Sequence, residues 1–285
     1  MDPLLHTQVP PTRKQRAVPA RAFEVCGLSH RGLVRSHNED CWFADERLGL
    51  AIVADGVGGQ ADGALASREA VDCVAKYLRR ATDASSLATS SQAVSTPAAT
   101  SHSGWQMQER VVARAIDLAN RRLVAVNAIA SDAKQRRGST IVGLWVPQGA
   151  DSLATIFHVG DSRMYLLRNE VLTPLTRDHS AYQQWLDSGK PGSPPSKNFI
   201  LQALGLSDVV PDICSVPTFP GDRFLLCSDG LTNAIDDGEL AGALADDGNM
   251  NSACERLVSL GLARGGNDNL TTVLCKLLGD EDRSR

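Results

Sequence analysis

Four strand-like segments joined by short turns constrain the fold of this chain more than any other feature. The segments run over residues 139–146, 152–159, 163–168 and 171–175. They are separated by Gly149-Ala150, Gly160-Asp161 and Arg168-Asn169, which are typical turn sequences. Strands that follow one another through such short turns are antiparallel neighbours, so the pattern predicts an antiparallel meander.

Helical periodicity appears in separate runs of the chain. Residues 64–80 and 108–131 each place apolar side chains three or four positions apart, which marks one face of an α-helix. The other elements expected from periodicity follow the meander: a helix at 181–186, a strand at 222–227, helices at 237–245 and 251–264, and a strand at 270–277. Because strands and helices arrive in segregated runs, the predicted class is α+β with antiparallel sheets and not a doubly wound fold.

The composition bears on which binding partners the protein can have and in which cellular compartment it lies. The chain has 285 residues and a formal net charge of −4, which argues against nucleic acid or an anionic membrane as a partner, since both bind a basic face. Its seven cysteines form no CxxC pair and are expected to be reduced, mostly buried thiols. Without a membrane-length apolar run or the apolar core of a signal peptide, the sequence predicts a cytoplasmic protein.

Three segments stand apart from the predicted core. Residues 1–20 combine prolines with a basic cluster and are expected to form a disordered arm. Residues 81–104 are almost entirely serine, threonine and alanine, which predicts a flexible insertion and not a domain boundary. The prediction is therefore a single domain over residues 21–279, with a tail at 280–285.

The stretch LGLAIVADGVGG at residues 48–59 carries the first candidate site residue. Its apolar run, residues 50–54, is typical of a buried strand and ends at Asp55. Gly56 leaves its backbone carbonyl accessible to a ligand because it has no side chain. The alternative is an Asp-Gly hairpin turn between two strands, which is the commoner meaning of this dipeptide.

Further acidic residues lie beside other predicted strands. Asp161 and Asp229 follow strands, while Glu39 and Asp268 lie in loops that precede strands. Carboxylates brought together by the fold repel one another unless a cation joins them, and oxygen ligands without histidine or cysteine favour Mg²⁺ or Mn²⁺. The six histidines show no ligand spacing, so His158 and His179 are expected to be structural.

A pair of such metal ions suits the hydrolysis of a phosphate ester. Two ions joined by a shared aspartate can activate a water molecule and stabilise the oxygens of an in-line displacement at phosphorus. The phosphate also needs a planar, permanently charged group, and Arg35 is the candidate. The alternative is that Arg35 is a surface residue paired with Glu39 or Asp40.

Seven blocks in order resemble one enzyme family. They are VRSHNED at 34–40, ADGVGG at 54–59, GST at 138–140, HVGDSRMYLLR at 158–168, LTRDHS at 175–180, LLCSDGL at 225–231 and GGNDNLTTVL at 265–274. Together they resemble the metal-dependent serine/threonine protein phosphatases of the protein phosphatase 2C (PPM) type, in their compact bacterial form. The resemblance covers about residues 23–278 and implies a sandwich of two antiparallel β-sheets flanked by antiparallel helix pairs.

The resemblance also implies a set of metal ligands. Asp55 would bridge two ions, Mn²⁺ or Mg²⁺. Asp229 and Asp268 would complete the first site, and Glu39 with the Gly56 carbonyl the second, directly or through water.

Three further roles follow from the same resemblance. Asp161 with Asp229 would form a third, weaker metal site, Arg35 would bind the phosphate, and Asp40 would orient metal-bound water. A metal-bridging water or hydroxide would be the nucleophile, so no phospho-enzyme is implied. The family's occasional histidine after the Asp-Gly pair is replaced here by Val57, and the flap segment at 188–198 is short and proline-rich.

The implied function is hydrolysis of phosphoserine and phosphothreonine in proteins, reversing a bacterial Ser/Thr kinase, by a monomeric enzyme. Three alternatives stay open: a phosphoprotein-binding module without turnover, a partner-switching phosphatase with a dedicated regulator as substrate, and a structural Ca²⁺-binding protein. A binding module predicts the loss of at least one acidic ligand, and every ligand position is filled.

Overall fold

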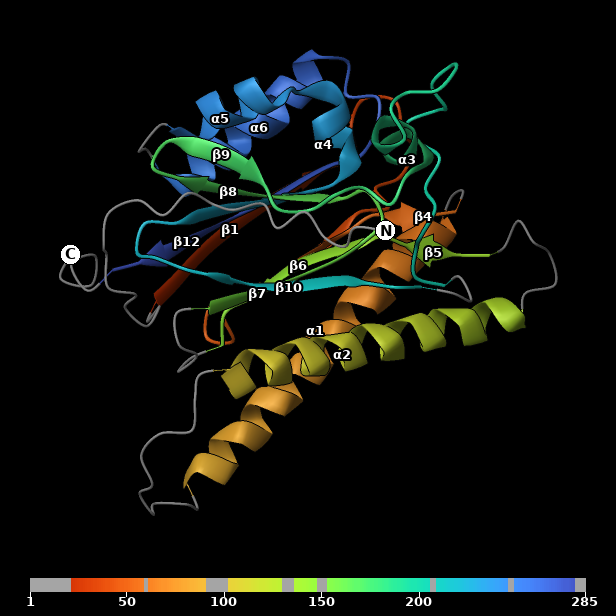
Figure 1. Ribbon diagram of the computed structural model, residues 1–285. Helices are drawn as coiled ribbons and strands as arrows, with labels where there is room; N and C mark the ends of the chain where they lie inside the picture. Colours follow the sequence, from red (N-terminus) through yellow and green to blue (C-terminus); the bar gives the residue numbers. More distant parts are fainter. Residues whose placement is uncertain are drawn as a thin grey trace.

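Two antiparallel β-sheets packed face to face form the centre of the computed structural model (Figure 1). The structure describes residues 22–58, 61–90, 102–129, 136–147, 153–205, 209–245 and 249–279. The predicted arm at 1–20 and tail at 280–285 lie outside the described residues.

The first sheet has five strands in the order β1-β12-β11-β8-β9. Their bounds are Ala22–His30 (β1), Leu270–Leu278 (β12), Arg223–Cys227 (β11), Arg163–Arg168 (β8) and Val171–Pro174 (β9). The first and last strands of the described chain pair over their whole length, from Ala22 opposite Leu278 to His30 opposite Leu270. This long pairing joins the N-terminal and C-terminal strands of the described chain in one sheet.

The second sheet also has five strands, in the order β10-β7-β6-β3-β2. Their bounds are Asp212–Pro217 (β10), Leu153–Val159 (β7), Ile141–Trp145 (β6), Leu50–Ala54 (β3) and Cys41–Asp45 (β2). A short separate pair, β4 (Gly56–Val57) with β5 (Gly138–Ser139), lies at the end of this sheet.

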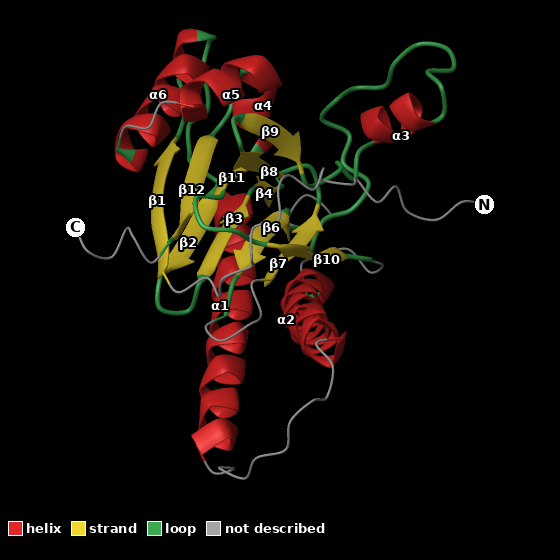
Figure 2. Cartoon of the chain, turned by 60° about the vertical axis from the view of Figure 1, so that its left-hand side comes forward, coloured by secondary structure: helices red, strands yellow, loops and turns green. Residues whose placement is uncertain are grey.

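Helices cover both outer faces of the sandwich (Figures 1 and 2). The long helices α1 (Ala61–Ser90) and α2 (His102–Ala128) lie against the second sheet. The helices α4 (Asp229–Ala234), α5 (Asp237–Ala245) and α6 (Met250–Ala263) cover the first sheet, and the short helix α3 (Ala181–Asp187) lies to one side. The expected α+β sandwich flanked by helices is confirmed.

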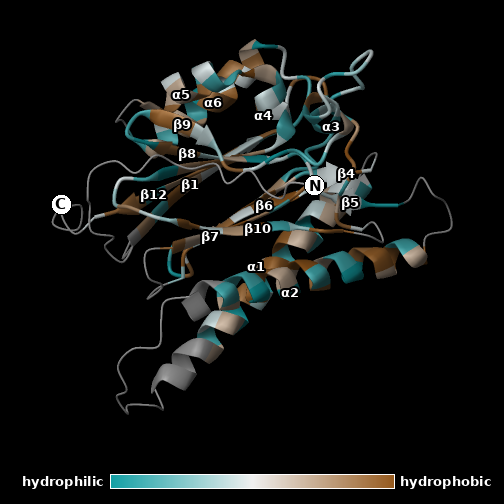
Figure 3. Cartoon of the chain, in the orientation of Figure 1, coloured by the Kyte–Doolittle hydropathy of each residue, from teal (hydrophilic) through white to brown (hydrophobic). Residues whose placement is uncertain are grey.

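Alternation along the strands explains how both faces of each sheet are buried. In β3, Leu50 and Ile52 face the helices α1 and α2, while Ala51 and Val53 face the other sheet. A strand that is buried on both faces reads as a continuous apolar run, as LAIVA does. The helices bury one face only, and Figure 3 shows hydrophilic and hydrophobic residues alternating along α2.

Residues 81–104, expected above as a flexible insertion, are helical at both ends. Helix α1 continues to Ser90 and helix α2 begins at His102, so the expectation is wrong for these parts, while residues 91–101 lie outside the described chain. The physical reason is that a helix already begun extends at little cost, and the alanines in 81–90 are good helix formers.

Strand β10 and helix α4 are among the elements that the sequence analysis did not predict. Strand β10 is a half-buried edge strand that ends at Pro217, and its mixed composition hides the period of two. Helix α4 begins at Asp229, directly after β11, where only a strand end was expected. None of the helices in the described part of the chain combines the length and the apolar character that a membrane-spanning helix needs.

Candidate active site

The register of both sheets brings the predicted acidic residues to one end of the sandwich. In the second sheet Ala54, just before Asp55, pairs with Cys41, just after Asp40. In the first sheet Cys227 pairs with Thr272, so Asp229 and Asp268 lie at the same edge. Antiparallel pairing therefore gathers carboxylates from distant parts of the sequence.

Asp55 lies in a connection that is fixed by backbone bonds. Its N–H donates to Thr140 Oγ1 at 2.9 Å, and the Thr140 N–H donates to the Asp55 carbonyl at 2.9 Å. Thr140 Oγ1 also lies 2.7 Å from Ser162 Oγ. Strands β3 and β4 pair with other strands and not with each other, so the hairpin-turn alternative for Asp55-Gly56 is wrong.

Glu39 and Gly56 meet at the start of helix α1. The Gly56 N–H donates to the Glu39 carbonyl at 3.1 Å, and the Ser67 hydroxyl donates to the same carbonyl at 2.6 Å. A Cβ atom at Gly63 would lie 2.9 Å from Glu39 Cδ and 3.0 Å from the Gly56 carbonyl oxygen. Glycine at position 63 is therefore what allows the Glu39 carboxylate and the Gly56 carbonyl to share this corner.

Asp229 and Asp268 approach each other where helix α4 meets the loop before β12. A Cβ atom at Gly230 would lie only 2.0 Å from the Asn269 carbonyl oxygen and 3.1 Å from Asp268 Cβ, so the two segments are packed backbone to backbone. Burial, then the charge of Asp268, raises the pKa of Asp229, although a hydrogen bond with Asp55 opposes the shift.

Asp161 is the most buried of the predicted carboxylate ligands, with 5% of its surface exposed. It follows Gly160, whose φ of +110° suits glycine, in the turn between β7 and β8. Burial and the charge of Asp229 raise the pKa of Asp161 to about 8. Its Oδ1 is buried and has no hydrogen-bond partner among the described residues.

The electrostatics of the cluster are those of a cation site. Burial and neighbouring carboxylates raise the pKa of Asp55 well above its usual value, and burial raises that of Glu39. Glu39 Oε1, like Asp161 Oδ1, is buried without a hydrogen-bond donor in the described structure. Buried carboxylate oxygens without hydrogen-bond donors fit hard divalent cations such as Mn²⁺ or Mg²⁺.

Arg35 lies at the edge of this cluster. Its guanidinium donates to Asp268 Oδ2 at 2.7 Å, and half of its side chain, 51%, is exposed. The hydrogen bond to Asp268 raises the pKa of Arg35. The alternative, a surface pairing with Glu39 or Asp40, is not the pairing formed, because the ion pair of Arg35 is with Asp268.

Asp40 lies behind the cluster and is held by two hydroxyl groups. Its Oδ2 accepts from Ser228 Oγ at 2.7 Å and from Thr271 Oγ1 at 2.6 Å, while its Oδ1 is buried without a partner in the described structure. Burial raises the pKa of Asp40 to about 7, with the charge of Asp229 adding to the shift. The structure thus brings all eight predicted site residues, Arg35, Glu39, Asp40, Asp55, Gly56, Asp161, Asp229 and Asp268, into one region.

Comparison with known proteins identifies the family. The model of the family described as "Protein phosphatase 2C" matches residues 26–275. The chain belongs to the protein phosphatase 2C family. The family expected from the seven sequence blocks, and with it the expectation of an enzyme, is confirmed.

Individual relatives agree with this assignment. The serine/threonine phosphatase stp of Listeria innocua is 31% identical over 253 residues, covering 86% of this chain and 92% of the relative. The structure of PppA, described as a key regulatory component of T6SS in Pseudomonas aeruginosa, superimposes with a TM-score of 0.72 at 32% identity, covering 89% of this chain and 97% of PppA. The catalytic domain of the phosphatase PstP in complex with two manganese ions gives a TM-score of 0.71 at 28% identity, covering 90% and 99%.

Asn269 organises the site of this phosphatase, and sequence reasoning missed it. Its Oδ1 accepts from the Glu39 N–H at 2.8 Å, and its Nδ2 donates to the carbonyls of Arg31 and His37, both at 2.9 Å. It is 4% exposed. The signal was present, because Asn269 lies inside the block GGNDNLTTVL, but nothing in the sequence shows that its side chain crosses to the loop that carries Glu39.

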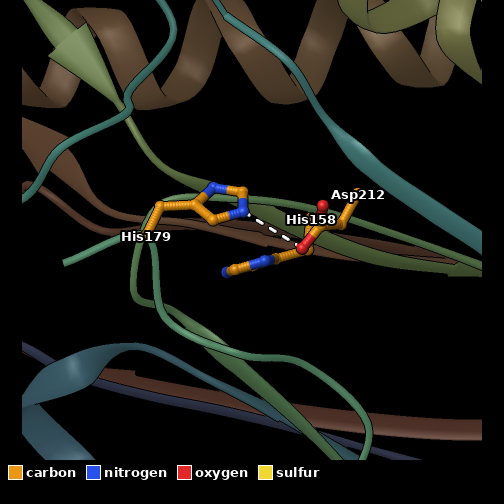
Figure 4. Close-up of side chains that lie close together, drawn as sticks. All are labelled: His158, His179 and Asp212. Atoms are coloured by element: carbon orange, nitrogen blue, oxygen red, sulfur yellow. Dashed lines mark hydrogen bonds and ion pairs between the residues drawn. The ribbon is translucent and has the colours of Figure 1, made fainter. Parts of the chain in front are cut away.

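His158, His179 and Asp212 form a second polar cluster, shown in Figure 4, whose ligand-type atoms lie within 4.8 Å of one another. His179 Nε2 lies 3.1 Å from Asp212 Oδ2, and His179 Nδ1 accepts the Gly160 N–H at 3.2 Å. Since Nδ1 uses its lone pair, Nε2 carries the proton and donates it to Asp212. A metal-bound histidine would instead donate through its free nitrogen. The hydrogen bonds of His179 therefore favour a structural role, in which its ring supports the turn before Asp161, over a role as a metal ligand.

Proposed function

We propose that this phosphatase hydrolyses phosphoserine and phosphothreonine in proteins, in a reaction that requires Mn²⁺ or Mg²⁺. The observation that carries the proposal is the convergence of buried carboxyl groups from separate segments, with Glu39 Oε1 and Asp161 Oδ1 lacking donors in the described structure. The alignment with a manganese complex of PstP supports the choice of metal.

Six residues would hold the metal ions. Asp55 would bridge two of them, Asp229 and Asp268 would complete one site, and Glu39 with the Gly56 carbonyl the other. Asp161 would hold a third, weaker ion together with Asp229. The charge of Asp229 already raises the pKa of Asp161. When bound, the ions supply a nucleophilic water at neutral pH and stabilise negative charge on the phosphoryl oxygens.

The remaining steps are phosphate binding, activation of water and protonation of the leaving group, and they involve positions Arg35, Asp40 and Val57. The half-exposed guanidinium of Arg35, which contacts the cluster through Asp268, would bind two phosphoryl oxygens. Asp40, with one oxygen held by hydroxyl groups and one free of them, would orient the attacking water and accept its proton. Val57 cannot donate a proton, so water or another acid would protonate the departing seryl or threonyl oxygen.

We further propose that residues 21–279 form one domain that acts as a cytoplasmic monomer on the products of a Ser/Thr kinase. The support is the shared core of both sheets, in which residues of β3, β6, β8, β11 and β12 pack together. The relatives named as serine/threonine phosphatases support the substrate class.

The test is hydrolysis of a phosphothreonine peptide by the purified protein with Mn²⁺ and with chelator. Asp229→Asn is expected to lower kcat by at least about 100-fold, because it removes a charged ligand from two ions. Asp117→Asn, at an exposed position of α2 that pairs with Arg121, is the matched control and is expected to keep full activity. Metal-independent hydrolysis, or an unimpaired Asp229→Asn enzyme, would contradict the mechanism, and inactivity on all phosphopeptides would favour a binding module.

A further inference from the structure

Two cysteine side chains from distant parts of the sequence meet beneath helix α6. Cys26 lies in β1 and Cys254 in α6, and their sulfur atoms are 3.1 Å apart although the residues are separated by 228 positions. A disulfide bond is about 2.05 Å long, so the two sulfurs need to approach by only about 1 Å to be bonded. The remaining five cysteines of the chain are also free.

The two thiols differ in a way that suits successive reactions. Cys26 is half-buried at the edge of the layer between β1 and α6, whereas Cys254 is 2% exposed and packed among leucines of α6 and β12. The hydrogen bond with Cys254 lowers the pKa of Cys26 despite its burial, and a lowered pKa favours the reactive thiolate. Cys26 is thus the accessible nucleophile and Cys254 the inner partner.

We propose that Cys26 and Cys254 form an oxidisable dithiol that hydrogen peroxide converts into a disulfide bond. The Cys26 thiolate attacks one peroxide oxygen, the O–O bond breaks, and the products are a sulfenic acid at Cys26 and, after protonation, one water molecule. Cys254 Sγ then attacks the Cys26 sulfur, forms the S–S bond and expels a second water molecule. Two thiols and one peroxide thus give one disulfide and two waters. Two molecules of an external thiol reduce the disulfide by exchange and are themselves joined in a disulfide.

The bond would join two elements that both lead into the active site. Strand β1 runs into the loop with Arg35 and Glu39, and helix α6 runs into the loop with Asp268. These loops already touch, because the Leu33 N–H donates to the Gly266 carbonyl at 2.7 Å. A covalent link behind them closes a chain loop of more than 200 residues and restricts the unfolded state.

The test uses the native, full-length protein without any substitution. The protein is exposed to hydrogen peroxide well below its unfolding temperature. It is then unfolded in denaturant with an alkylating agent so that buried thiols react, digested without reduction, and mapped by mass spectrometry. The expected result is a peptide pair that joins Cys26 to Cys254 and is lost on reduction with dithiothreitol. The oxidised protein is also expected to unfold about 5 °C or more above the reduced protein.

Single substitutions supply the controls. Cys26→Ser and Cys254→Ser are each expected to abolish the cross-linked peptide and the rise in Tm, while Cys214→Ser, at an exposed position of the edge strand β10, leaves both unchanged. Two results would overturn the proposal: Cys26 and Cys254 both remaining available to the alkylating agent, or Cys26 progressing to the sulfinic acid without a link to Cys254. Both results are read from the unsubstituted protein, so they do not depend on how the variants fold.

Discussion

His179 holds the backbone of Gly160 at two points, because its N–H donates to the Gly160 carbonyl at 2.7 Å and its Nδ1 accepts the Gly160 N–H at 3.2 Å. The carboxylate of Asp212 fixes the ring from the other side. Gly160 directly precedes Asp161, so the ring controls where this proposed ligand lies.

We expect His179→Ala to weaken metal binding at Asp161 more than it weakens the fold. The loss of a partner for the Gly160 N–H costs about 1–3 kcal/mol of stability, and substitutions behind a ligand lower metal affinity by about 10-fold or more. The measurement is phosphatase activity as a function of Mn²⁺ concentration. Asp212→Asn keeps an acceptor for Nε2 and is the matched control, and an unchanged Mn²⁺ requirement in His179→Ala would show that the ring does not position Asp161.

Asn269→Ala tests the link between the loop of Glu39 and the loop of Asp268. The substitution removes three hydrogen bonds at a buried position and leaves the Glu39 N–H without its acceptor. We expect a loss of about 3 kcal/mol in the free energy of unfolding and a fall of at least about 10-fold in kcat/KM. Asn267→Ala, an exposed position in the same loop, is the control in urea unfolding and peptide hydrolysis. If Asn269→Ala and Asn267→Ala had the same free energy of unfolding, the Asn269 side chain would not link the two loops.

The elements that the sequence predicts well are those whose burial is complete on one face. Ala70 in α1 and Ile116 in α2, which lie on the predicted apolar faces, are fully buried, and the bounds of β8 and α5 agree with the expected ones. Local periodicity is enough to predict these elements, because packing against a sheet requires only apolar side chains at the spacing of the helix or strand.

The site could be predicted in its charged residues but not in the contacts that hold them. Asp55 and Asp229 are visible at strand ends, whereas the hydrogen bonds from Ser228 and Thr271 to Asp40 join segments about 190 to 230 positions apart. Short polar residues serve equally well in turns and caps, so their types alone do not reveal a partner. Helix α4 was missed for a similar reason, since an Asp-Gly pair after a strand is also a common turn.

The raised pKa of Asp40, about 7, predicts a pH dependence of stability in the metal-free protein. An unfolded aspartate ionises near pH 4, so between about pH 4 and pH 7 the folded protein keeps a proton that the unfolded chain has lost. The free energy of unfolding therefore falls as the pH rises through this window. In chelator, we expect urea unfolding to show lower stability at pH 7.5 than at pH 5.

Asp40→Asn is the variant that isolates this effect. It removes the charge while keeping the shape, so the decrease in stability between pH 5 and pH 7.5 is expected to be smaller than in the unsubstituted protein, although Asp55 and Asp161 still contribute. Its activity with Mn²⁺ is expected to fall, since the proposed acceptor for the proton of water is lost. A pH dependence identical to that of the unsubstituted protein would mean that Asp40 is ionised in the folded state.

Arg35→Ala separates phosphate binding from stability. An ion pair with 51% of the arginine side chain exposed contributes little to folding, so the free energy of unfolding is expected to change by less than about 1 kcal/mol. A bidentate contact to phosphate is worth more, and its loss is expected to lower kcat/KM by about 10- to 100-fold, with a rise in KM and weaker inhibition by inorganic phosphate. Arg121→Ala, which breaks an exposed pair on α2, is the control. If Arg35→Ala lowered kcat alone and left inhibition by phosphate unchanged, Arg35 would act on the carboxylate of Asp268 and not on the substrate.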